Sequence, residues 1–425
     1  MCIVRTTREA VTWAKRAVVA IVLVGAAVIP GRASNGQPRH CAGPRCTTAG
    51  SILWAAALPG LWLARPGVSG TAPADGGAYA ATGGGLAVIG TGTTVIAFDD
   101  STGKQSWRVT LAGLPAGWAV VGVRAFQGII AVGVAPSLGP SSTAPGQSGA
   151  GRREVMLSAA TGRQIRSYPA ATYGGAVAAS RASTVIVGAR AITAYDNATG
   201  RVRWSRAIGA TGQTWRVTGN TIYVTADGAS AGVAGRVALR RIDLRTGAQR
   251  IVHIQGTAPG SLTDAVGNVV LFSGADGVRA YQGSNGTFRW RDAAEVELVD
   301  SGQDSVYLAS GNRLLGVSLP TGKVLSSAPI SVAASLYGVA DGVAFGLDEN
   351  GLGDSWGYDL QTRRIVWTSG PLPWPHFFVD LSGLGGSLSP GGTIALLATC
   401  TDVGSAANAT AAPACRRPEL EAVRI

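Results

Sequence analysis

A short phrase that recurs along this chain constrains its fold more than any other feature. In its full form the phrase is a Thr-Gly or Asn-Gly turn with a tryptophan four residues after the glycine, as in TGRVRW at 199–204. Weaker copies keep the turn and lack the tryptophan. Successive copies are 36 to 59 residues apart, measured at Gly50, Gly103, Gly162, Gly200, Gly247, Gly286, Gly322 and Arg363. A repeat of this length indicates that one small structural unit is copied along the chain.

Each full copy follows short apolar segments of strand length. VIAFDD at 95–100 and ITAYDN at 192–197 directly precede a turn, and TVIVGA at 184–189 precedes one of them. These segments are rich in β-branched residues and are separated by Gly, Asn, Asp and Ser, which is typical of strands. No apolar period of 3.6 residues is evident after residue 35. We therefore predict four strands per unit, with the Thr-Gly turn between the third and fourth.

Aspartates precede several of these turns at a fixed distance. Asp99, Asp196, Asp243 and Asp359 each stand four residues before the glycine position. A carboxylate at such a place can accept hydrogen bonds from the N–H groups of the turn. We therefore predict a structural role for these acidic residues.

A four-stranded unit repeated at this spacing predicts an all-β chain folded as a β-propeller. SILWAAAL at 51–58 has the pattern of a fourth strand without predecessors, and the last unit supplies three strands before the chain stops at Ile425. We predict eight four-stranded blades over residues 50–425, with the N-terminal strand closing the last blade and thereby removing open edges. Seven blades is the alternative count.

The tryptophans of the phrase have a predicted structural role. Each would lie near the middle of the outermost strand of its blade, where a large flat side chain can pack against the next blade and bury apolar area. We predict this docking role for Trp54, Trp107, Trp204, Trp290 and Trp367.

The N-terminal region has the order of a secretory leader. A basic segment ending in Lys15 and Arg16 precedes an apolar run at 17–29, and small residues follow up to Ala33. Residues 1–33 are thus predicted to be a signal peptide, with Ala33 before the cleavage point. The alternative is an uncleaved membrane anchor formed by residues 11–30. Either reading places the rest of the chain outside the cytoplasm, secreted or held at the outer face of the cell membrane.

The cysteines outside the leader fall into two close pairs. Cys41 and Cys46 lie in a linker at 34–49, and Cys400 and Cys415 lie near the C-terminus. An even number of cysteines in an exported chain predicts disulfides, here one within each pair. Neither pair has the spacing of a zinc site. The histidines are too scattered to suggest another metal site: His40, His253 and His376.

The charge pattern argues against a nucleic-acid partner. The formal net charge is +12, yet the arginines are scattered through the repeats and form no dense basic run. Charged residues make up only 14% of the chain. A dispersed basic balance of this kind is typical of solvated strand faces. We expect a monomer whose partners are not nucleic acids.

The repeat resembles that of a known family. AFDDSTGKQSW at 97–107 and AYDNATGRVRW at 194–204 are similar to the tryptophan-docking repeat of the propellers related to pyrroloquinoline quinone (PQQ) enzymes. The resemblance spans about residues 50–425. It implies one of two outcomes: a dehydrogenase that uses PQQ, a calcium or lanthanide ion and a catalytic aspartate, or a non-catalytic scaffold like the lipoprotein of the outer-membrane protein assembly machinery.

The residues present favour the non-catalytic branch. The chain has no adjacent cysteine pair of the kind found in many of these dehydrogenases, and no matching set of calcium ligands is evident. Aspartates that can approach the central channel are interpreted as polar lining: Asp264, Asp300, Asp341 and Asp380. We predict no catalytic residue, no metal and no cofactor, with a divergent PQQ- and calcium-dependent dehydrogenase as one alternative. An extracytoplasmic sensor on an N-terminal anchor is the other.

One face of the predicted propeller collects the insertions. The segments 137–153, 226–235 and 348–354, together with the loop from Cys400 to Cys415, connect strands on that face. Functional residues favour loops held by a rigid scaffold. The densest aromatic group there is Trp374, His376 and Phe377. We predict that this group binds a protein, a peptide or a cell-envelope polymer, so that the chain acts as a binding or scaffolding platform.

Overall fold

The computed structural model describes residues 52–58, 79–136, 152–170, 175–188, 190–208, 214–225, 237–255, 260–274, 276–293, 295–298, 305–310, 313–329, 334–340, 343–348, 355–359, 364–368, 377–378, 394–400 and 418–424. All regular elements in these ranges are strands, which confirms the prediction of an all-β chain. They contain no helix long and apolar enough to cross a membrane. The predicted leader at 1–33, the predicted linker at 34–49 and both of its cysteines lie outside the described residues.

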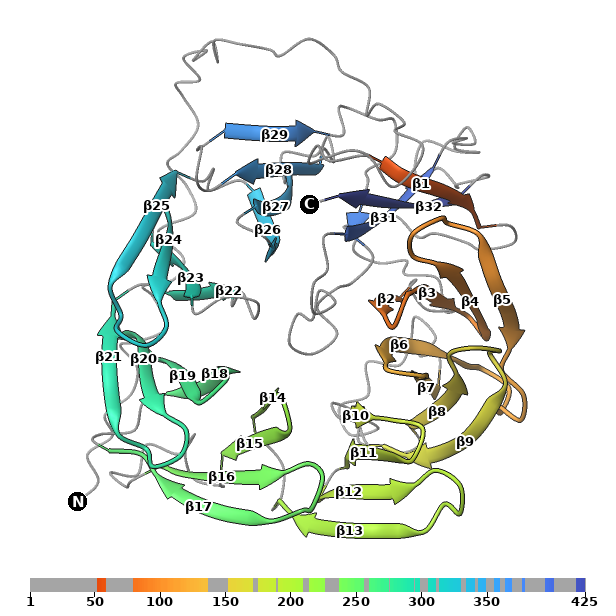
Figure 1. Ribbon diagram of the computed structural model, residues 1–425, viewed down its shortest axis with the longest axis horizontal. Coiled ribbons are helices and arrows are strands. Elements are labelled where there is room, and N and C mark those ends of the chain that lie inside the picture. Colours follow the sequence, from red (N-terminus) through yellow and green to blue (C-terminus); the bar gives the residue numbers. More distant parts are fainter. Residues whose placement is uncertain are drawn as a thin grey trace, which may run out of the picture. The chain divides into compact units, whose positions relative to one another are not determined.

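The strands form four-stranded antiparallel sheets in which consecutive strands are neighbours (Figure 1). The first two comprise β2 (Tyr79–Gly83), β3 (Leu86–Thr91), β4 (Thr94–Asp99) and β5 (Gln105–Thr110), then β6 (Trp118–Phe126), β7 (Ile129–Pro136), β8 (Arg153–Ser158) and β9 (Gln164–Pro169). The next two comprise β10 (Gly175–Ala179), β11 (Ser183–Val187), β12 (Ala191–Asp196) and β13 (Val202–Ala207), then β14 (Trp215–Thr218), β15 (Thr221–Thr225), β16 (Ala238–Asp243) and β17 (Gln249–His253).

The same pattern continues along the second half of the chain. The sheets are β18 (Ser261–Val266), β19 (Val269–Gly274), β20 (Gly277–Gln282) and β21 (Phe288–Asp292); β22 (Glu295–Leu298), β23 (Ser305–Ser310), β24 (Arg313–Ser318) and β25 (Val324–Pro329); and β26 (Ala334–Ala340), β27 (Val343–Asp348), β28 (Ser355–Asp359) and β29 (Arg364–Thr368). The unit of four strands predicted from the repeat is therefore confirmed.

One sheet combines the two ends of the described chain. It contains β30 (Phe377–Phe378), β31 (Ile394–Cys400), β32 (Pro418–Arg424) and β1 (Ile52–Ala57), in the order β1-β32-β31-β30. β1 pairs antiparallel with β32, so that Trp54 lies opposite Ala422. The described strands thus make up eight four-stranded sheets, as expected for a β-propeller.

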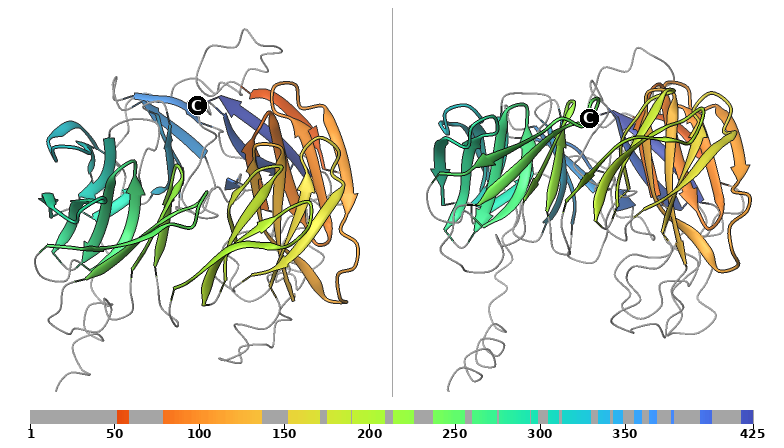
Figure 2. Two further views of the ribbon diagram at one scale, coloured as in Figure 1. Left: turned by 60° about the horizontal axis from the view of Figure 1, so that its bottom comes forward. Right: turned by 90° about the horizontal axis from the view of Figure 1, so that it is seen from below.

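The sheets from β2 to β21 each bury both of their faces against neighbouring sheets. On β7, Ile130 and Val132 pack with β3–β5 residues such as Val88, whereas Ile129 and Ala131 pack with Ile186 of β11. Similar apolar clusters join each sheet to the next one from β2 to β25, and Figures 1 and 2 show these sheets side by side. Burial on both faces explains why the strands read as continuous apolar runs without strict alternation. A fully buried Ile or Val contributes about 1.5–3 kcal/mol relative to an exposed one.

The Thr-Gly turns are closed by the aspartates that precede them. Asp99 Oδ1 accepts hydrogen bonds from the N–H groups of Ser101 and Thr102 at 3.2 and 2.9 Å. Asp196 and Asp243 accept the N–H groups of their own turns, at 2.8 Å from Thr199 and 2.7 Å from Thr246. The predicted structural role is confirmed at these three positions. The turn after Asp359 lies outside the described residues.

Candidate functional site

The aromatic group predicted to bind a partner lies almost entirely outside the described residues. Trp374 and His376 are outside them, and the backbone of Phe377 begins β30 opposite Ala398 of β31. The insertions at 137–151, 226–236 and 349–354 are also outside. The backbone of Cys400 ends β31 opposite Pro418, and Cys415 is not among the described residues. The aromatic binding group and the disulfides therefore stay predictions.

Tryptophans of the repeat reach from one sheet to the turn of the next. The indole N–H groups of Trp54, Trp107 and Trp290 donate to the carbonyl oxygens of Asp100, Ala159 and Leu319 at 2.7, 2.7 and 2.8 Å. The rings also cover the turn glycines. A Cβ atom on Gly162 would lie 2.6 Å from the indole of Trp107, so only glycine fits there. The repeat spacing thus places one aromatic ring against each of these turns.

The ring of Trp204 also covers a turn glycine, but this tryptophan is less buried than the other three. A Cβ atom on Gly247 would lie 2.6 Å from its indole, although the ring is only half-buried. Arg206, two residues later on β13, donates to the carbonyl of Gly247 at 2.6 Å. For Trp367 only the backbone is described, in β29 opposite Gly357.

An arginine replaces the tryptophan in the copy TGRQIR. Arg166 stands four residues after Gly162, and its guanidinium donates to the carbonyl oxygens of Asn197 and Ala198 in the next turn, at 3.4 and 2.9 Å. A Cβ atom on Gly200 would lie 2.5 Å from that guanidinium. Charge-assisted hydrogen bonds to the turn carbonyls thus substitute for the aromatic contact. The sequence interpretation missed this residue, although its position in the repeat is the signal that identifies it.

A buried charge cluster joins β6–β9 to β10–β13. Glu154 of β8 is 1% exposed and forms ion pairs with Arg152 at 3.3 Å and with Arg124 of β6 at 3.9 Å. Arg124 also donates to the carbonyl of Ala176 on β10 at 3.1 Å. Burial lowers the pKa of Arg124, and the neighbouring Glu154 carboxylate opposes this shift. Because Arg124 contacts both Glu154 of β8 and the backbone of β10, the cluster links the two sheets.

A second arginine links two inner strands, β14 and β18. Arg216 of β14 donates through Nε to the carbonyl of Thr263. Burial raises the pKa of the neighbouring Asp264 carboxyl, and the N–H of Ala265 and the charge of Arg216 oppose this shift. Arg124 and Arg216 occupy equivalent places on their strands, since each stands two residues before the strand ends. Both arginines therefore link their sheet to the next inner strand.

The aspartates considered for the channel give no catalytic constellation among the described residues. Asp264 faces Arg216, while Asp300, Asp341 and Asp380 lie outside the described part of the chain. Within that part, no three His, Cys, Asp or Glu side chains are grouped as a metal site requires. His253 is exposed on β17, far in sequence from His40 and His376, which are not described.

Exposed apolar and basic side chains gather on the outermost strand of four consecutive sheets. The exposed large apolar side chains of the described residues all lie there: Val202 of β13, Ile251 of β17, Phe288 of β21, and Val324 and Leu325 of β25. Exposed basic side chains accompany them in the same strands and in the turns before them: Arg201, Arg203, Arg245, Arg250, Arg289, Arg291 and Lys323. We call this set of apolar and basic side chains the outer rim.

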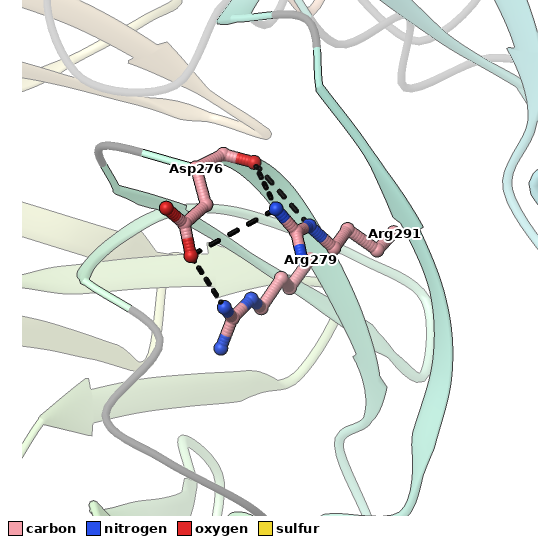
Figure 3. Close-up of polar contacts among 3 residues, drawn as sticks. All are labelled: Asp276, Arg279 and Arg291. Carbon is pink, nitrogen blue, oxygen red and sulfur yellow. Dashed lines mark hydrogen bonds and ion pairs between the residues drawn. The ribbon is translucent and has the colours of Figure 1, made fainter.

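Part of the rim charge is neutralised locally. Asp276, in the turn before β20, pairs with Arg279 at 3.0 Å and with Arg291 of β21 at 3.8 Å (Figure 3). Arg291 also donates to the carbonyl of Asp276 at 3.2 Å. Asp276 is 60% exposed, and ion pairs of this kind contribute little to stability. Arg291 is thus paired within its own sheet, although its side chain stays half exposed.

The structure and the comparisons together define the class of protein. Four-stranded sheets linked by repeat tryptophans make a β-propeller with PQQ-like repeats. Residues 151–369, more than half of the chain, match the family model described as outer membrane protein assembly factor BamB. The chain belongs to this family.

Solved structures with a similar fold are distant in sequence. The computationally designed Ika8 protein is 16% identical, with a TM-score of 0.51 over 81% of this chain and 95% of its own. BamB from Moraxella catarrhalis is 20% identical, with a TM-score of 0.42 over 64% of this chain and 80% of its own. Hsv2 from Kluyveromyces lactis is 10% identical, with a TM-score of 0.43 over 68% of this chain and 95% of its own. None of the curated proteins compared with the chain is significantly similar to it.

Proposed function

We propose that this chain is an extracytoplasmic, non-catalytic scaffold that binds a protein partner during the assembly of envelope proteins. The observation that carries the proposal is the match of residues 151–369 to the family of outer membrane protein assembly factor BamB. The outer rim supports it, because exposed apolar and arginine side chains are enriched at surfaces that bind proteins.

The proposed scaffold is an eight-bladed ring. The pairing of β1 with β32 supports closure of the last blade by the N-terminal strand. The contacts of Trp54, Trp107, Trp204 and Trp290 with neighbouring turns support a docking role, which we extend to Trp367 by its place in the repeat. A leader at 1–33 and disulfides within the two cysteine pairs complete the proposal for an exported protein.

Depletion of the protein in its source organism tests this function. We expect the envelope fraction to lose a defined set of membrane-embedded proteins, measured by quantitative mass spectrometry, while the levels of cytoplasmic proteins stay constant. Restoration of the full chain from a plasmid is the control. An unchanged envelope proteome would contradict the proposal.

The dehydrogenase alternative is tested separately on the purified full-length chain. PQQ is titrated with calcium while tryptophan fluorescence is followed, and dye reduction is then assayed with alcohols and sugars. The scaffold proposal predicts neither saturable binding nor turnover. Turnover that depends on added PQQ would replace the scaffold with an enzyme.

A further inference from the structure

The outermost strand of most sheets is interrupted by a bulge next to the docking residue. Register shifts occur in the pairs β4–β5, β8–β9, β12–β13, β20–β21, β24–β25 and β28–β29, and also in β1–β32. Among the described sheets, β16–β17 is the exception, because its register runs without a shift from Ala238 and His253 to Ile242 and Gln249. β17 is therefore a regular strand at the outer edge of its sheet (Figure 1).

The missing bulge changes which residue faces the next sheet. Arg250 lies opposite Arg241, two residues before Asp243, just as Trp204 lies opposite Ala194, two residues before Asp196. Arg250 thus occupies the place of the docking tryptophan, yet its side chain is exposed and makes no ion pair or hydrogen bond with the described residues. The turn of the next sheet packs instead on backbone, since a Cβ atom on Gly286 would collide with the carbonyl of His253.

The backbone of β17 directs hydrogen-bonding groups outward at alternate residues. Asp243 N donates to Ala248 O at 2.9 Å and Ile254 N to Val237 O at 3.0 Å, so residues with even numbers bond to β16. In an antiparallel ladder the residues between them point their N–H and C=O groups away from that partner. Gln249 and Ile251 therefore present these groups at an edge that no described strand covers. Such an edge is a template for another strand.

The side chains around this edge select the kind of strand that fits. Ile251 is 58% exposed and supplies an apolar contact. The segment from Leu239 to His253 contains four arginines and one aspartate, a net charge of +3. That aspartate, Asp243, is engaged by the N–H groups of Arg245 and Thr246. The exposed Arg245 and Arg250 are thus left to attract carboxylates.

We propose that the outer edge of β17 receives an extended acidic segment of a partner protein as an added strand. The backbone groups of Gln249 and Ile251 bond the incoming chain, Ile251 contacts an apolar side chain, and Arg245 and Arg250 pair with flanking carboxylates. Addition of a strand to a sheet edge is a recurrent mode of peptide recognition, in which main-chain hydrogen bonds give affinity and side chains give specificity. This inference rests on the proposed function, because it names the partner chemistry of the scaffold.

The bulged strand β13 offers a matched control. Val202 is 57% exposed, and it also directs its backbone outward, because Asp196 N bonds to Arg201 O next to it at 2.8 Å. The register shift between Ala194 and Tyr195 interrupts β13 beyond that point. Proline at Ile251 or at Val202 removes an outward N–H without breaking the ladder, since neither N–H bonds the neighbouring strand. Only Ile251→Pro is expected to affect strand addition.

The test uses the purified full-length chain and a fluorescent peptide of alternating valine and glutamate. We expect saturable, salt-sensitive binding by anisotropy, which Ile251→Pro weakens about tenfold because an interfacial hydrogen bond is lost and its partner is left unpaired. Val202→Pro should bind like the unmodified chain. A valine–lysine peptide and a backbone N-methylated valine–glutamate peptide should not bind. Equal binding by both proline variants, or by the N-methylated peptide, would overturn the proposal.

Hydrogen exchange gives a readout that does not depend on how the variants fold. In the unmodified chain we expect the amide of Ile251 to exchange fast and to become protected when the valine–glutamate peptide is added, whereas the amide of Arg250 is protected in both states. Unchanged exchange at Ile251 would contradict strand addition. Sedimentation of the chain alone tests whether a second copy of the chain occupies this edge instead. A dimer that Ile251→Pro dissociates would show that it does.

Failure of this inference can be told apart from failure of the proposed function. If Ile251→Pro restores the envelope proteins of a depleted strain as well as the unmodified chain does, the β17 edge is not the partner site, and the scaffold function stands. If depletion itself leaves the envelope unchanged, the scaffold function fails whatever the peptide does.

Discussion

At the scale of the residue, the turn aspartates show how one side chain sets local structure. Folding lowers the pKa of Asp99 through the hydroxyl groups of Ser101 and Thr102, and that of Asp196 through the backbone N–H of Thr199. The hydroxyl of Thr246 lowers the pKa of Asp243 in the same way. Since the charged carboxylate is what the turn recognises, each contributes stability above its unfolded pKa and loses it as pH falls through the folded pKa.

We therefore expect the free energy of unfolding to decline on acidification below about pH 4, the ordinary pKa range of aspartate. Asp243→Asn should make this decline shallower, because one linked proton is removed. Urea unfolding at a series of pH values, followed by circular dichroism, measures the slope. A slope that is the same in Asp243→Asn would show that this turn does not recognise the charge.

Trp107 is the docking residue whose contribution is easiest to isolate. It is 8% exposed and donates to Ala159 O at 2.7 Å. Trp107→Ala should lower the free energy of unfolding by about 3–5 kcal/mol, as for other buried aromatic truncations. Trp204→Ala should cost less, because Trp204 is only half-buried. Denaturant unfolding compares the two, and equal small losses would argue against docking as a source of stability.

At the scale of the element, the turn between the third and fourth strands is both a connection and a docking surface. Gly162 has a φ of 67° and lies under Trp107, so it needs glycine for its backbone and for its lack of a side chain. Gly92 has a φ of 53° with open space around its Cβ position. A comparison of alanine substitutions at these two glycines therefore separates the cost of backbone strain from the cost of displacing the indole.

Gly92→Ala should cost about 1 kcal/mol, the usual penalty for alanine at positive φ. Gly162→Ala should add about 1–3 kcal/mol more, because the methyl group displaces the indole. Thermal unfolding of both variants gives the comparison. Equal destabilisation would mean that the indole accommodates the methyl group at no cost.

Strands and turns could be predicted from the sequence because their signals are local. The glycine, the aspartate four residues before it and the short apolar runs all lie within one unit. The Glu154 cluster and the regular edge of β17 could not be predicted, because the first depends on contacts between sheets and the second on the absence of a bulge. TGAQRI has the same length as TGRVRW, yet Arg250 takes the place that Trp204 holds in the other copy. The predicted binding residues Trp374 and His376 lie outside the described residues and stay predictions.

At the scale of the whole molecule, stability is shared among similar interfaces between neighbouring sheets. The cluster around Trp54 combines Ala56 of β1, Ile89 of β3 and Leu420 of β32. Interfaces built from successive repeats contribute nearly additively when each contacts only its neighbours. The sheet that contains β1 differs, because its strands come from both ends of the described chain.

Deletion of residues 52–57 tests that sheet. Loss of β1 exposes the edge of β32 and removes Trp54 from the turn at Asp100. We expect the deletion variant to lose cooperative unfolding or to aggregate, measured by calorimetry and light scattering. Deletion of an equal number of residues from the insertion at 137–151 is the control. A deletion variant that melts like the unmodified chain would exclude β1 as a structural strand.

The pairing of β1 with β32 also has a consequence for the order of folding. The sheets between Tyr79 and Thr368 are built from strands that follow one another in sequence, whereas β1 must wait for Pro418–Arg424 at the other end of the described residues. Until then β1 has an unsatisfied edge, and its contact is among the most distant in sequence that the fold contains. Such non-local closure is slow. We therefore expect the docking of β1 to be the last step when the chain refolds from denaturant, after the sheets built from neighbouring strands have formed.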